Sequence, residues 1–462
     1  MIEENNSQLK RSIDWKQGLF IALGVPLLIL PSIGTFANYA WGFSIIVWIL
    51  SVVQGFMQNM AYGELAVMFP GASGLPGYAQ TVFKGNNDNK YNISSFIGGF
   101  SAWSYWFAWA PAMAIFSLLI GSYLHGLIPA LNKVSEFKIS LVAGVVIFVL
   151  LIIVNYRGVS NGAKLGNILA IFSLAPLIII SMAPFFTGDF NFSNISMSWL
   201  PPSWTWDFKH IMILLGVFAM AQWSACAWET AAIYGPEYKD PKTDVPKALF
   251  VCGTICLFTF GVVQASCVGT IGIEGILQDP NSPMLTLSKQ TFGLIGGYIS
   301  VLMLIAAMIL IIQTAFLGSS RAMHSMASEG NLPKIFGKSN KFGTPIFAMV
   351  VIAIFNIFFI CLRTPTAIIA ASSIGYVFAN GISLFAYVVS YKDERFKNRF
   401  RPFKAPKGWN RVALIFGIFN LPLCLLGVIY LNSLDMGWAS TIVGFFVLAG
   451  YIPLWCYSKV EK

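Results

Sequence analysis

Glu229 is an acidic residue within a long apolar stretch of the chain, where a carboxylate is unusual. A charge at the middle of a membrane costs about 2.5–3.5 kcal/mol on insertion scales, so such residues usually have a function or are protonated. The alternative is a capping or interhelical contact that is purely structural. We therefore treat Glu229 as a candidate functional residue.

The other residues that commonly do chemistry are few and dispersed. His125, His210 and His324 lie near the ends of apolar segments and are not paired by spacing. The chain contains no CxxC motif, and its cysteines are Cys226, Cys252, Cys256, Cys267, Cys361, Cys424 and Cys456. We expect these to be small buried side chains, with no disulfide, metal or cofactor. A membrane-embedded enzyme is disfavoured, because paired acids and metal ligands are missing from the apolar segments.

The elements that carry these residues are apolar and long. Of 462 residues, 56% are hydrophobic and 10% are charged, whereas soluble domains have about 25% charged residues. A transmembrane helix needs about 20 mostly apolar residues. Twelve segments qualify, at about 17–39, 41–68, 94–127, 139–156, 164–185, 210–234, 247–273, 293–320, 344–362, 366–391, 411–431 and 437–458. The sequence predicts an all-α polytopic membrane protein in a lipid bilayer.

The basic residues predict how the chain is oriented. If the N-terminus is inside, the inner segments carry 24 of the 29 Lys and Arg residues and the outer segments carry 5. This asymmetry follows the positive-inside rule and predicts that both termini are cytoplasmic. It also accounts for the net charge of +10, so we do not expect a nucleic-acid partner.

Four motifs follow predicted helices two, six, eight and ten. They are Tyr62-Gly63-Glu64-Leu65 with Phe69-Pro70 to Tyr78, Glu237 with Asp240-Pro241 to Ala248, Ser320-Arg321 with Met326 to Pro333, and Arg401-Pro402-Phe403-Lys404-Ala405-Pro406. In this order the motifs resemble those of the amino acid–polyamine–organocation family across nearly the whole chain. Their Pro and Gly residues are typical of turns, which favours an architectural role over contact with a solute.

The resemblance implies one transmembrane transporter domain over 1–462. Its fold would be a five-plus-five inverted repeat, about 17–185 and 210–391, with two extra helices at about 411–458. Helices one and six would be broken near mid-membrane and bind the solute there. The implied substrate-binding residues are Gly24, Val25, Pro26 and Leu27 in helix one, and Trp223, Ser224, Ala225, Cys226, Ala227 and Trp228 in helix six. A plain proline kink at Pro26 is the alternative.

Carrying the family's roles over residue by residue shows matches and departures. In the arginine/agmatine exchangers, a Glu equivalent to Glu229 is a proton sensor, so the resemblance makes Glu229 a candidate coupling or gating residue. An aromatic residue at the position of Trp223 caps the substrate in those exchangers, although core packing would also explain Trp223. Met113 occupies the position of those exchangers' substrate-binding Asn, and Ser173 that of the coupling Lys of proton-coupled members. Pro26 lacks an amide where the family's amides hold a carboxylate.

We therefore expect secondary active transport, by symport or exchange, of an amino acid across the cytoplasmic membrane. Access would alternate by rocking helices one, two, six and seven against the rest, with H+, Na+ or an exchange solute as a second partner. An amine or polyamine permease or exchanger remains an alternative, because such solutes lack the carboxylate. A solute sensor without transport is a further alternative, although we see no added signalling domain.

Overall fold

The computed structural model describes residues 13–22, 24–72, 74–84, 91–156 and 174–461. Their secondary structure is helical, apart from an isolated bridge between Ile13 and Tyr238. The first half contains α1 Trp15–Ala22, η1 Val25–Ser32, α2 Ile33–Ala40, η2 Trp41–Phe43, α3 Ser44–Met68, α4 Gly74–Phe83, α5 Ile93–Trp109, α6 Ala112–Leu127, η3 Pro129–Lys133, α7 Glu136–Asn155, α9 Leu174–Thr187, α10 Phe192–Ser196 and α11 Phe208–Ala225.

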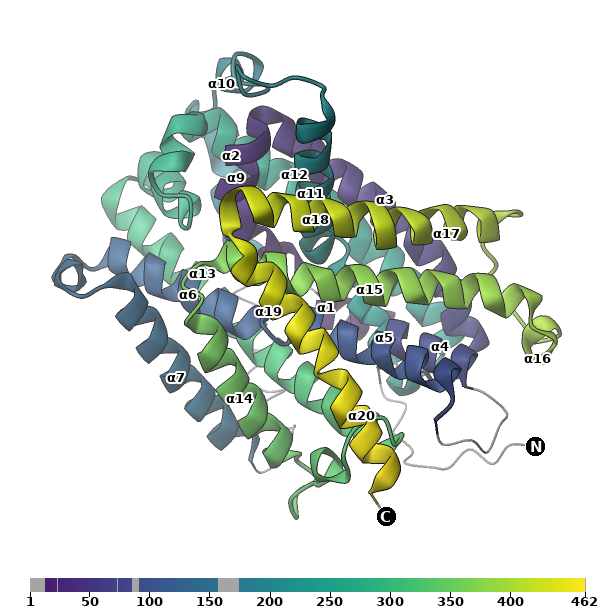
Figure 1. Ribbon diagram of the computed structural model, residues 1–462. Helices are drawn as coiled ribbons and strands as arrows, with labels where there is room; N and C mark the ends of the chain where they lie inside the picture. Colours follow the sequence, from purple (N-terminus) through teal and green to yellow (C-terminus); the bar gives the residue numbers. More distant parts are fainter. Residues whose placement is uncertain (1–12, 23, 73, 85–90, 157–173, 462) are drawn as a thin grey trace.

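The second half begins with a 3-10 helix, η4. The order is η4 Ala227–Glu237, α12 Pro241–Gln278, α13 Pro283–Ser328, η5 Lys334–Gly337, α14 Ile346–Ile360, α15 Pro365–Lys392, α16 Glu394–Lys397, α17 Trp409–Ile418, η6 Phe419–Cys424, α18 Leu425–Leu431, η7 Asn432–Met436, α19 Trp438–Ala449 and α20 Tyr451–Val460. Two of these, η6 and η7, are π-helical. Together with α17 and α18 they form one helical stretch (Figure 1).

All twelve predicted membrane segments overlap with helices of the structure. The described residues contain nine helical stretches that are long and apolar enough to cross a membrane, and two shorter apolar helices, α9 and α14. One stretch, Val25–Met68, has 44 residues and includes most of the first two predicted segments. The chain is thus an all-helical protein with many candidate spans, while the count of twelve and the inverted repeat remain predictions.

Two glycines mark where predicted segments end and begin. Gly272 interrupts α12 with a φ of 69°, and Gly293 interrupts α13 with a φ of 68°. Only glycine adopts this region readily, because a Cβ would clash with the backbone. The predicted boundaries at 273 and 293 therefore coincide with real turns of the backbone, which separate the apolar helices from the short connecting segments.

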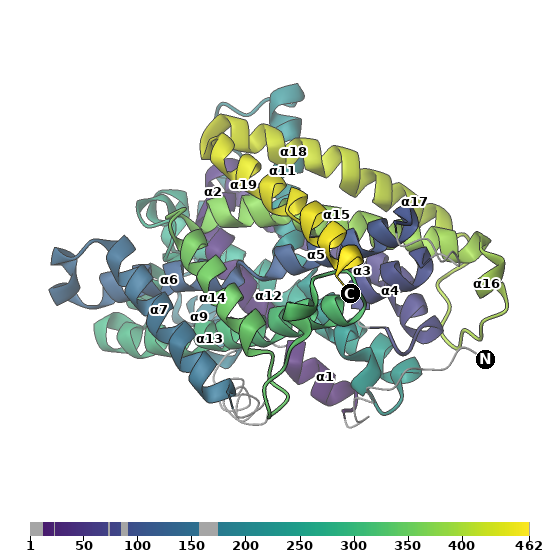
Figure 2. The ribbon, with the colours of Figure 1, turned by 60° about the horizontal axis from the view of Figure 1, so that its bottom comes forward.

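Central and peripheral helices differ in burial. The α5–α6 stretch and α15 are each 89% buried over their most apolar windows, whereas α7 is 22% buried. Val142, Val146 and Ile153 of α7 are more than half exposed, as expected for a surface that faces lipid. Figures 1 and 2 show α15 packed against α5, with α17 covering α15 from the outside and with α7 and α14 also at the outside.

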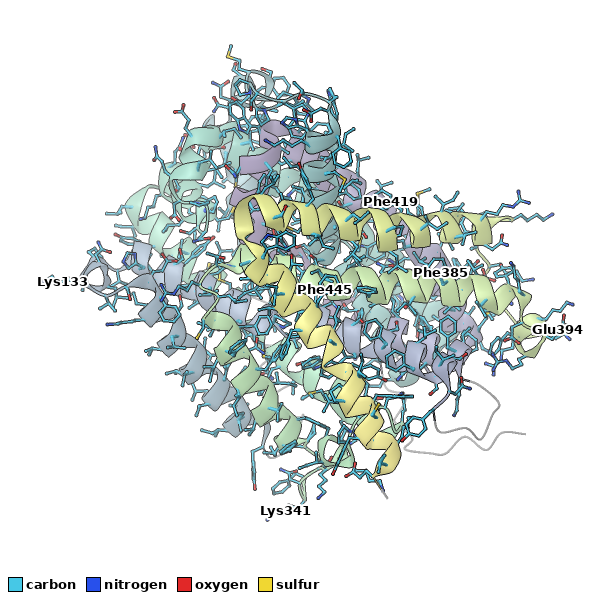
Figure 3. The ribbon with its side chains drawn as sticks, viewed as in Figure 1. Lys133, Lys341, Phe385, Glu394, Phe419 and Phe445 are labelled. Atoms are coloured by element: carbon cyan, nitrogen blue, oxygen red, sulfur yellow. The ribbon has the colours of Figure 1, made fainter. Side chains whose placement is uncertain are left out.

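Side chains from distant segments pack along α15. A Cβ at Gly417 would come within 3.2 Å of the Phe385 ring, so α17 lies close to α15 there. Figure 3 shows Phe385 on α15, Phe419 on η6 and Phe445 on α19. Because α15 contacts α3, α5 and α11 on its other sides, it connects the C-terminal helices to those that carry the candidate site.

Candidate functional site

The first predicted helix loses α-helical geometry in its middle. The α1 helix ends at Ala22, and the 3-10 helix η1 begins at Val25. Pro26 lies in the first turn of η1, where its missing amide hydrogen costs little, and Pro31 removes a second donor inside the same helix. Val25, Pro26 and Leu27 are buried, and the amide of Leu27 donates to the carbonyl of Gly24 at 3.1 Å.

The sixth predicted helix changes in the same way. The α11 helix begins at its cap Asp207, whose carboxylate accepts the amide of His210 at 2.9 Å. This bond and, to a smaller extent, hydrogen bonds from the side chains of Thr205 and His210 lower the pKa of Asp207 to about 2. The α11 helix ends at Ala225, and the 3-10 helix η4 follows from Ala227. The η1 helix packs against α11 and α12. Both interruptions lie on elements that contact one another.

Cys226 lies where α11 gives way to η4. Its amide donates to the carbonyl of Gln222 at 3.0 Å, and its thiol donates to the carbonyl of Ser51 at 3.3 Å. A Cβ at Gly55 would come within 3.1 Å of the Cys226 sulfur, so α3 approaches this point closely. The small side chains Ser224, Ala225 and Ala227 are also fully buried. Small residues permit this close helix packing in a membrane protein.

Glu229 is fully buried at the start of η4. Its Oε2 accepts a hydrogen bond from the hydroxyl of Tyr376 at 2.8 Å, and its Oε1 has no hydrogen-bond partner among the described residues. The hydroxyl of Tyr105 also lies beside the Glu229 carboxylate, and Tyr62 interacts with it electrostatically. A buried carboxylate without a matching cation is costly, so this group can bind a cationic ligand or a proton.

The stacked indole rings of Trp223 and Trp109, called the aromatic wall below, lie near Glu229. The indole of Trp223 stacks on Trp109, with centroids 5.7 Å apart, and Trp109 meets Tyr376 edge-on at 6.2 Å. Trp223 is fully buried and donates from Nε1 to the carbonyl of Ala108 at 2.6 Å. The contacts from Trp223 through Trp109 to Tyr376 and Glu229 join α11, α5, α15 and η4 in one site.

Other predicted site residues lie in different surroundings. Trp228 donates to the carbonyl of Ala225 at 2.9 Å and packs on Phe56, 5.0 Å between centroids. Met113 is buried on α6, and the contacts that join Trp223 to Glu229 do not include it. Gly24 is partly exposed at the start of η1. Ser173 lies outside the described residues.

Several buried polar atoms near these interruptions lack a partner among the described residues. Ser32 Oγ at the end of η1 and Ser224 Oγ and Gln222 Oε1 near the end of α11 join Glu229 Oε1 in this respect. Leaving such a group unsatisfied costs about 1–3 kcal/mol. Polar groups of this kind, beside aromatic rings, are typical of a site for a small polar solute.

Comparison with known proteins decides the family. The family described as "Amino acid permease" matches residues 13–451. The chain belongs to this family. It is therefore a membrane transport protein for amino acids rather than an enzyme.

Individual relatives of this permease are distant. The uncharacterized amino acid permease YecA of Bacillus subtilis is 25% identical over 75% of this chain and 76% of its own length. The arginine/ornithine antiporter of Latilactobacillus sakei is 23% identical over 90% of this chain and 83% of its own. The amino-acid permease RocE of Bacillus subtilis is 23% identical over 76% and 73%.

Sequence reasoning about this permease missed Tyr376 and Trp109, which complete the site. It also missed two further contacts of α15: the Tyr62 hydroxyl donates to the side-chain oxygen of Asn380, and the Asn380 amide donates to Gln58 at 3.0 Å. A helical period would have revealed part of this arrangement. Polar residues recur on one face of α15, at Tyr376, Asn380, Ser383, Tyr387 and Tyr391.

Proposed function

We propose that this permease is a secondary transporter that binds its amino acid between η1, η4 and α5, beside Glu229. The observation that carries this proposal is the buried carboxylate of Glu229, whose Oε2 accepts from Tyr376 and whose Oε1 has no partner in the described part of the chain. Glu229 would oppose the ammonium group of the solute. The aromatic wall of Trp223 and Trp109 would cover its side chain.

Access to the site would alternate between the two sides of the cytoplasmic membrane. The moving group would be predicted helices one, two, six and seven, which correspond to α1 to α3, α11, η4 and α12. The remaining helices would form the second group, within a five-plus-five inverted repeat of twelve spans. Polar contacts such as Glu229 with Tyr376 lie between the two groups and would rearrange as they rock.

Uptake into proteoliposomes tests the proposal. Purified protein would be offered a panel of labelled amino acids and their decarboxylated amines, with empty liposomes as background. We expect saturable uptake of at least one amino acid, reduced by Glu229→Gln and unchanged by Glu274→Gln, a matched change at an exposed acid. If no amino acid enters above background while an amine does, the proposal is wrong.

The mode of coupling has its own experiment. The name of the Latilactobacillus sakei relative, an arginine/ornithine antiporter, makes exchange one mode to test, with symport of H+ or Na+ as the other. Preloading the liposomes with unlabelled solute accelerates uptake by an exchanger. An imposed proton or sodium gradient drives accumulation by a symporter, so the two modes separate in one preparation.

A carrier for an amine is the second candidate, and Pro26 favours it. A carboxylate bound at the start of η1 would lose one amide donor at Pro26. Losing one charge-assisted hydrogen bond costs about 1.5–3 kcal/mol, or roughly ten- to hundredfold in affinity. Competition between an amino acid and its decarboxylated amine for one labelled solute decides. If only the amine competes, it replaces the amino acid as the transported class.

A further inference from the structure

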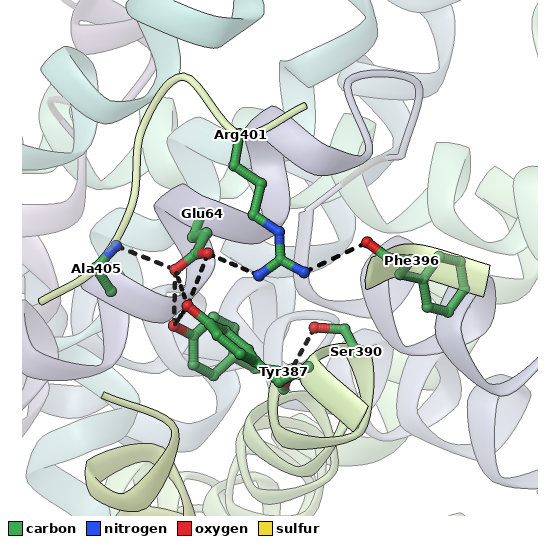
Figure 4. Close-up of polar contacts among 7 residues, drawn as sticks. Glu64, Tyr387, Ser390, Phe396, Arg401 and Ala405 are labelled. Carbon is green, nitrogen blue, oxygen red and sulfur yellow. Dashed lines mark hydrogen bonds and ion pairs between the residues drawn. The ribbon is translucent and has the colours of Figure 1, made fainter. Parts of the chain in front are cut away.

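Glu64, in the last turns of α3, has a dense set of hydrogen bonds (Figure 4). Its Oε1 accepts from Nη1 of Arg401 at 2.9 Å and from the hydroxyl of Tyr391 at 2.9 Å. Its Oε2 accepts from the hydroxyl of Tyr387 at 2.7 Å and from the backbone amide of Ala405 at 3.0 Å. Two of the four motifs, which are more than 300 residues apart in the chain, therefore meet at one buried carboxylate.

Arg401 is also held by several contacts. Its side chain is 9% exposed, and its guanidinium lies 4.5 Å from the centre of the Tyr391 ring. Its Nη2 donates to the carbonyl of Phe396 at 3.4 Å. Phe403 packs on Gly63, where a Cβ would come within 3.1 Å of the ring. The segment 398–408 is thus attached to the end of α3.

Among the neighbouring basic residues, Arg395 and Lys397 pair with Asp393 and Glu394, and Arg399 donates to the carbonyl of Met68 at 2.8 Å. Four others differ from Arg401. Lys392, Lys404, Lys407 and Arg411 are exposed, and none forms an ion pair within the described part of the chain. The positive-inside rule is sufficient to explain such residues. It does not require an arginine to be buried against a carboxylate, because that arrangement removes two charges from water.

Glu64 and the residues that donate to it, Tyr387, Tyr391, Arg401 and Ala405, form the Glu64 cluster. This cluster lies across the boundary between the two groups of helices that move against each other in the proposed transport cycle. Glu64 belongs to α3, whereas Tyr387, Tyr391 and Arg401 belong to α15 and the segment after it. The contacts of Glu229 with Tyr376 and of Gln58 with Asn380 cross the same boundary on the same α15 helix. Rocking of α3 against α15 therefore has to break or shear the Glu64 cluster.

We propose that Glu64 and Arg401 form a latch that holds this end of the transporter closed, and that Glu64 is a positioning residue for transport. The inference rests on the proposed alternating-access function. Opening the latch would release the end of α3 and favour the state open on the side of Arg401. Removing one partner leaves the other charge buried and unpaired in the closed state, which is strongly unfavourable, so its loss should change the balance between states.

The test uses Cys226 as a reporter, with the other six cysteines replaced by serine or alanine. Cys226 contacts Ser51 of α3 and is buried in the structure. A membrane-impermeant thiol reagent would be applied from the side of Arg401 to the full-length protein in liposomes. We expect Arg401→Gln to react at least tenfold faster than the parent, Arg401→Lys to lie between them, and Lys404→Gln to match the parent.

Two further variants separate a latch from general support of the fold. Glu64→Gln removes the same contact, so the double variant with Arg401→Gln should react no faster than the faster single variant. A latch also changes the maximal rate of uptake more than the half-saturating concentration. Unchanged Cys226 reactivity in folded Arg401→Gln overturns the latch, whether or not the thermal stability of the variant falls.

The reactivity of Cys226 is measured without any solute. It therefore reports whether the Glu64–Arg401 latch opens even if the transported solute is misassigned. Failure of all solutes to enter liposomes would refute the proposed function, while the response of Cys226 to Arg401→Gln would still report opening. If Glu64→Gln does not fold, the Cys226 reactivities of Arg401→Gln, Arg401→Lys and Lys404→Gln still decide whether the latch exists.

Discussion

Glu229 combines two properties that conflict unless it has a function: it is buried, and one of its oxygens is unpaired within the described structure. Neutral hydroxyls, such as that of Tyr376, do not neutralise a carboxylate. A proton or a cationic group of the solute would do so, and either would tie binding to the charge on Glu229. The charge of this one residue is therefore the variable to change first.

Glu229→Gln should flatten the dependence of uptake on pH. Glutamine keeps the size and the acceptor for Tyr376 but cannot take up or release a proton. Uptake by the variant and the parent would be measured across the neutral and mildly acidic range, with Glu274→Gln as the control. An unchanged pH profile in Glu229→Gln would reduce Glu229 to a structural role.

Cys226 offers a second test at the residue scale. If its thiol lines the solute path, a reagent small enough to enter should block uptake, and saturating solute should slow the reaction. Cys361 and Cys456 are exposed, so they should react at a rate that solute does not alter. Protection absent from Cys226 would mean that its thiol only packs against α3.

At the scale of elements, backbone interruptions decide where the polar groups lie. Proline supplies them in η1, where Pro26 and Pro31 prevent a continuous α-helix. Small residues accompany the change at the end of α11. Glycine supplies the turns in α12 and α13 through positive φ angles. Three kinds of local chemistry thus produce the breaks in otherwise uniform apolar helices.

Gly272→Ala should destabilise the protein by about 1–3 kcal/mol, because its φ of 69° and ψ of 172° lie in a region that suits glycine almost alone. Among the residues that the structure describes, and apart from its own neighbouring backbone, no heavy atom lies within 4 Å of a Cβ added there, so the effect comes from the backbone conformation. Gly318→Ala is the matched control, since it has equal space without a positive φ.

Thermal unfolding of the purified variants makes this comparison. Gly318→Ala should leave the melting temperature unchanged or raise it, because alanine is favoured over glycine inside a helix by roughly 0.5–1 kcal/mol. Equal melting temperatures for Gly272→Ala and Gly318→Ala would show that the backbone turn at Gly272 is unstrained for alanine.

At the scale of the whole molecule, segments predicted to face opposite sides of the membrane lie apart. Figure 1 shows α10 at the top, whereas α16 and the end of α20 lie to the right and at the bottom. In Figure 3, Lys133, from a predicted outer segment, lies at the left, and Lys341 and Glu394, from predicted inner segments, lie at the bottom and right. This separation agrees with the asymmetry in basic residues.

Cysteine labelling in intact cells tests the orientation. With Cys361 and Cys456 replaced, Met197→Cys in the predicted outer loop should react with an impermeant reagent applied from outside. Met197 is 85% exposed, so the loop presents the new thiol to solvent. Lys404→Cys, which is also exposed, should react only after the cells are opened. The reverse pattern would invert the predicted topology.

The sequence by itself determined that the chain is helical and apolar, where helices one and six lose α-helical geometry, and the family, while the count of twelve spans remains a prediction. Each depends on local properties: an apolar segment partitions into lipid wherever its neighbours lie, a proline removes its own amide, and a motif keeps its order along the chain. The boundaries at Gly272 and Gly293 could be predicted for this reason. Glu229 could also be selected as a candidate functional residue, because an acid in an apolar segment is costly in any fold.

Only the tertiary structure decided which groups those residues meet. Tyr376 lies 147 residues from Glu229, and Arg401 lies 337 from Glu64. Such pairs depend on the rotation of each helix about its axis and on its depth beside its neighbour. An apolar helix can face lipid in many rotations about its axis. A rotation that leaves a buried polar group without its hydrogen-bond partner is costly. Contacts between helices, and not the composition of either helix, therefore select the partners of both carboxylates.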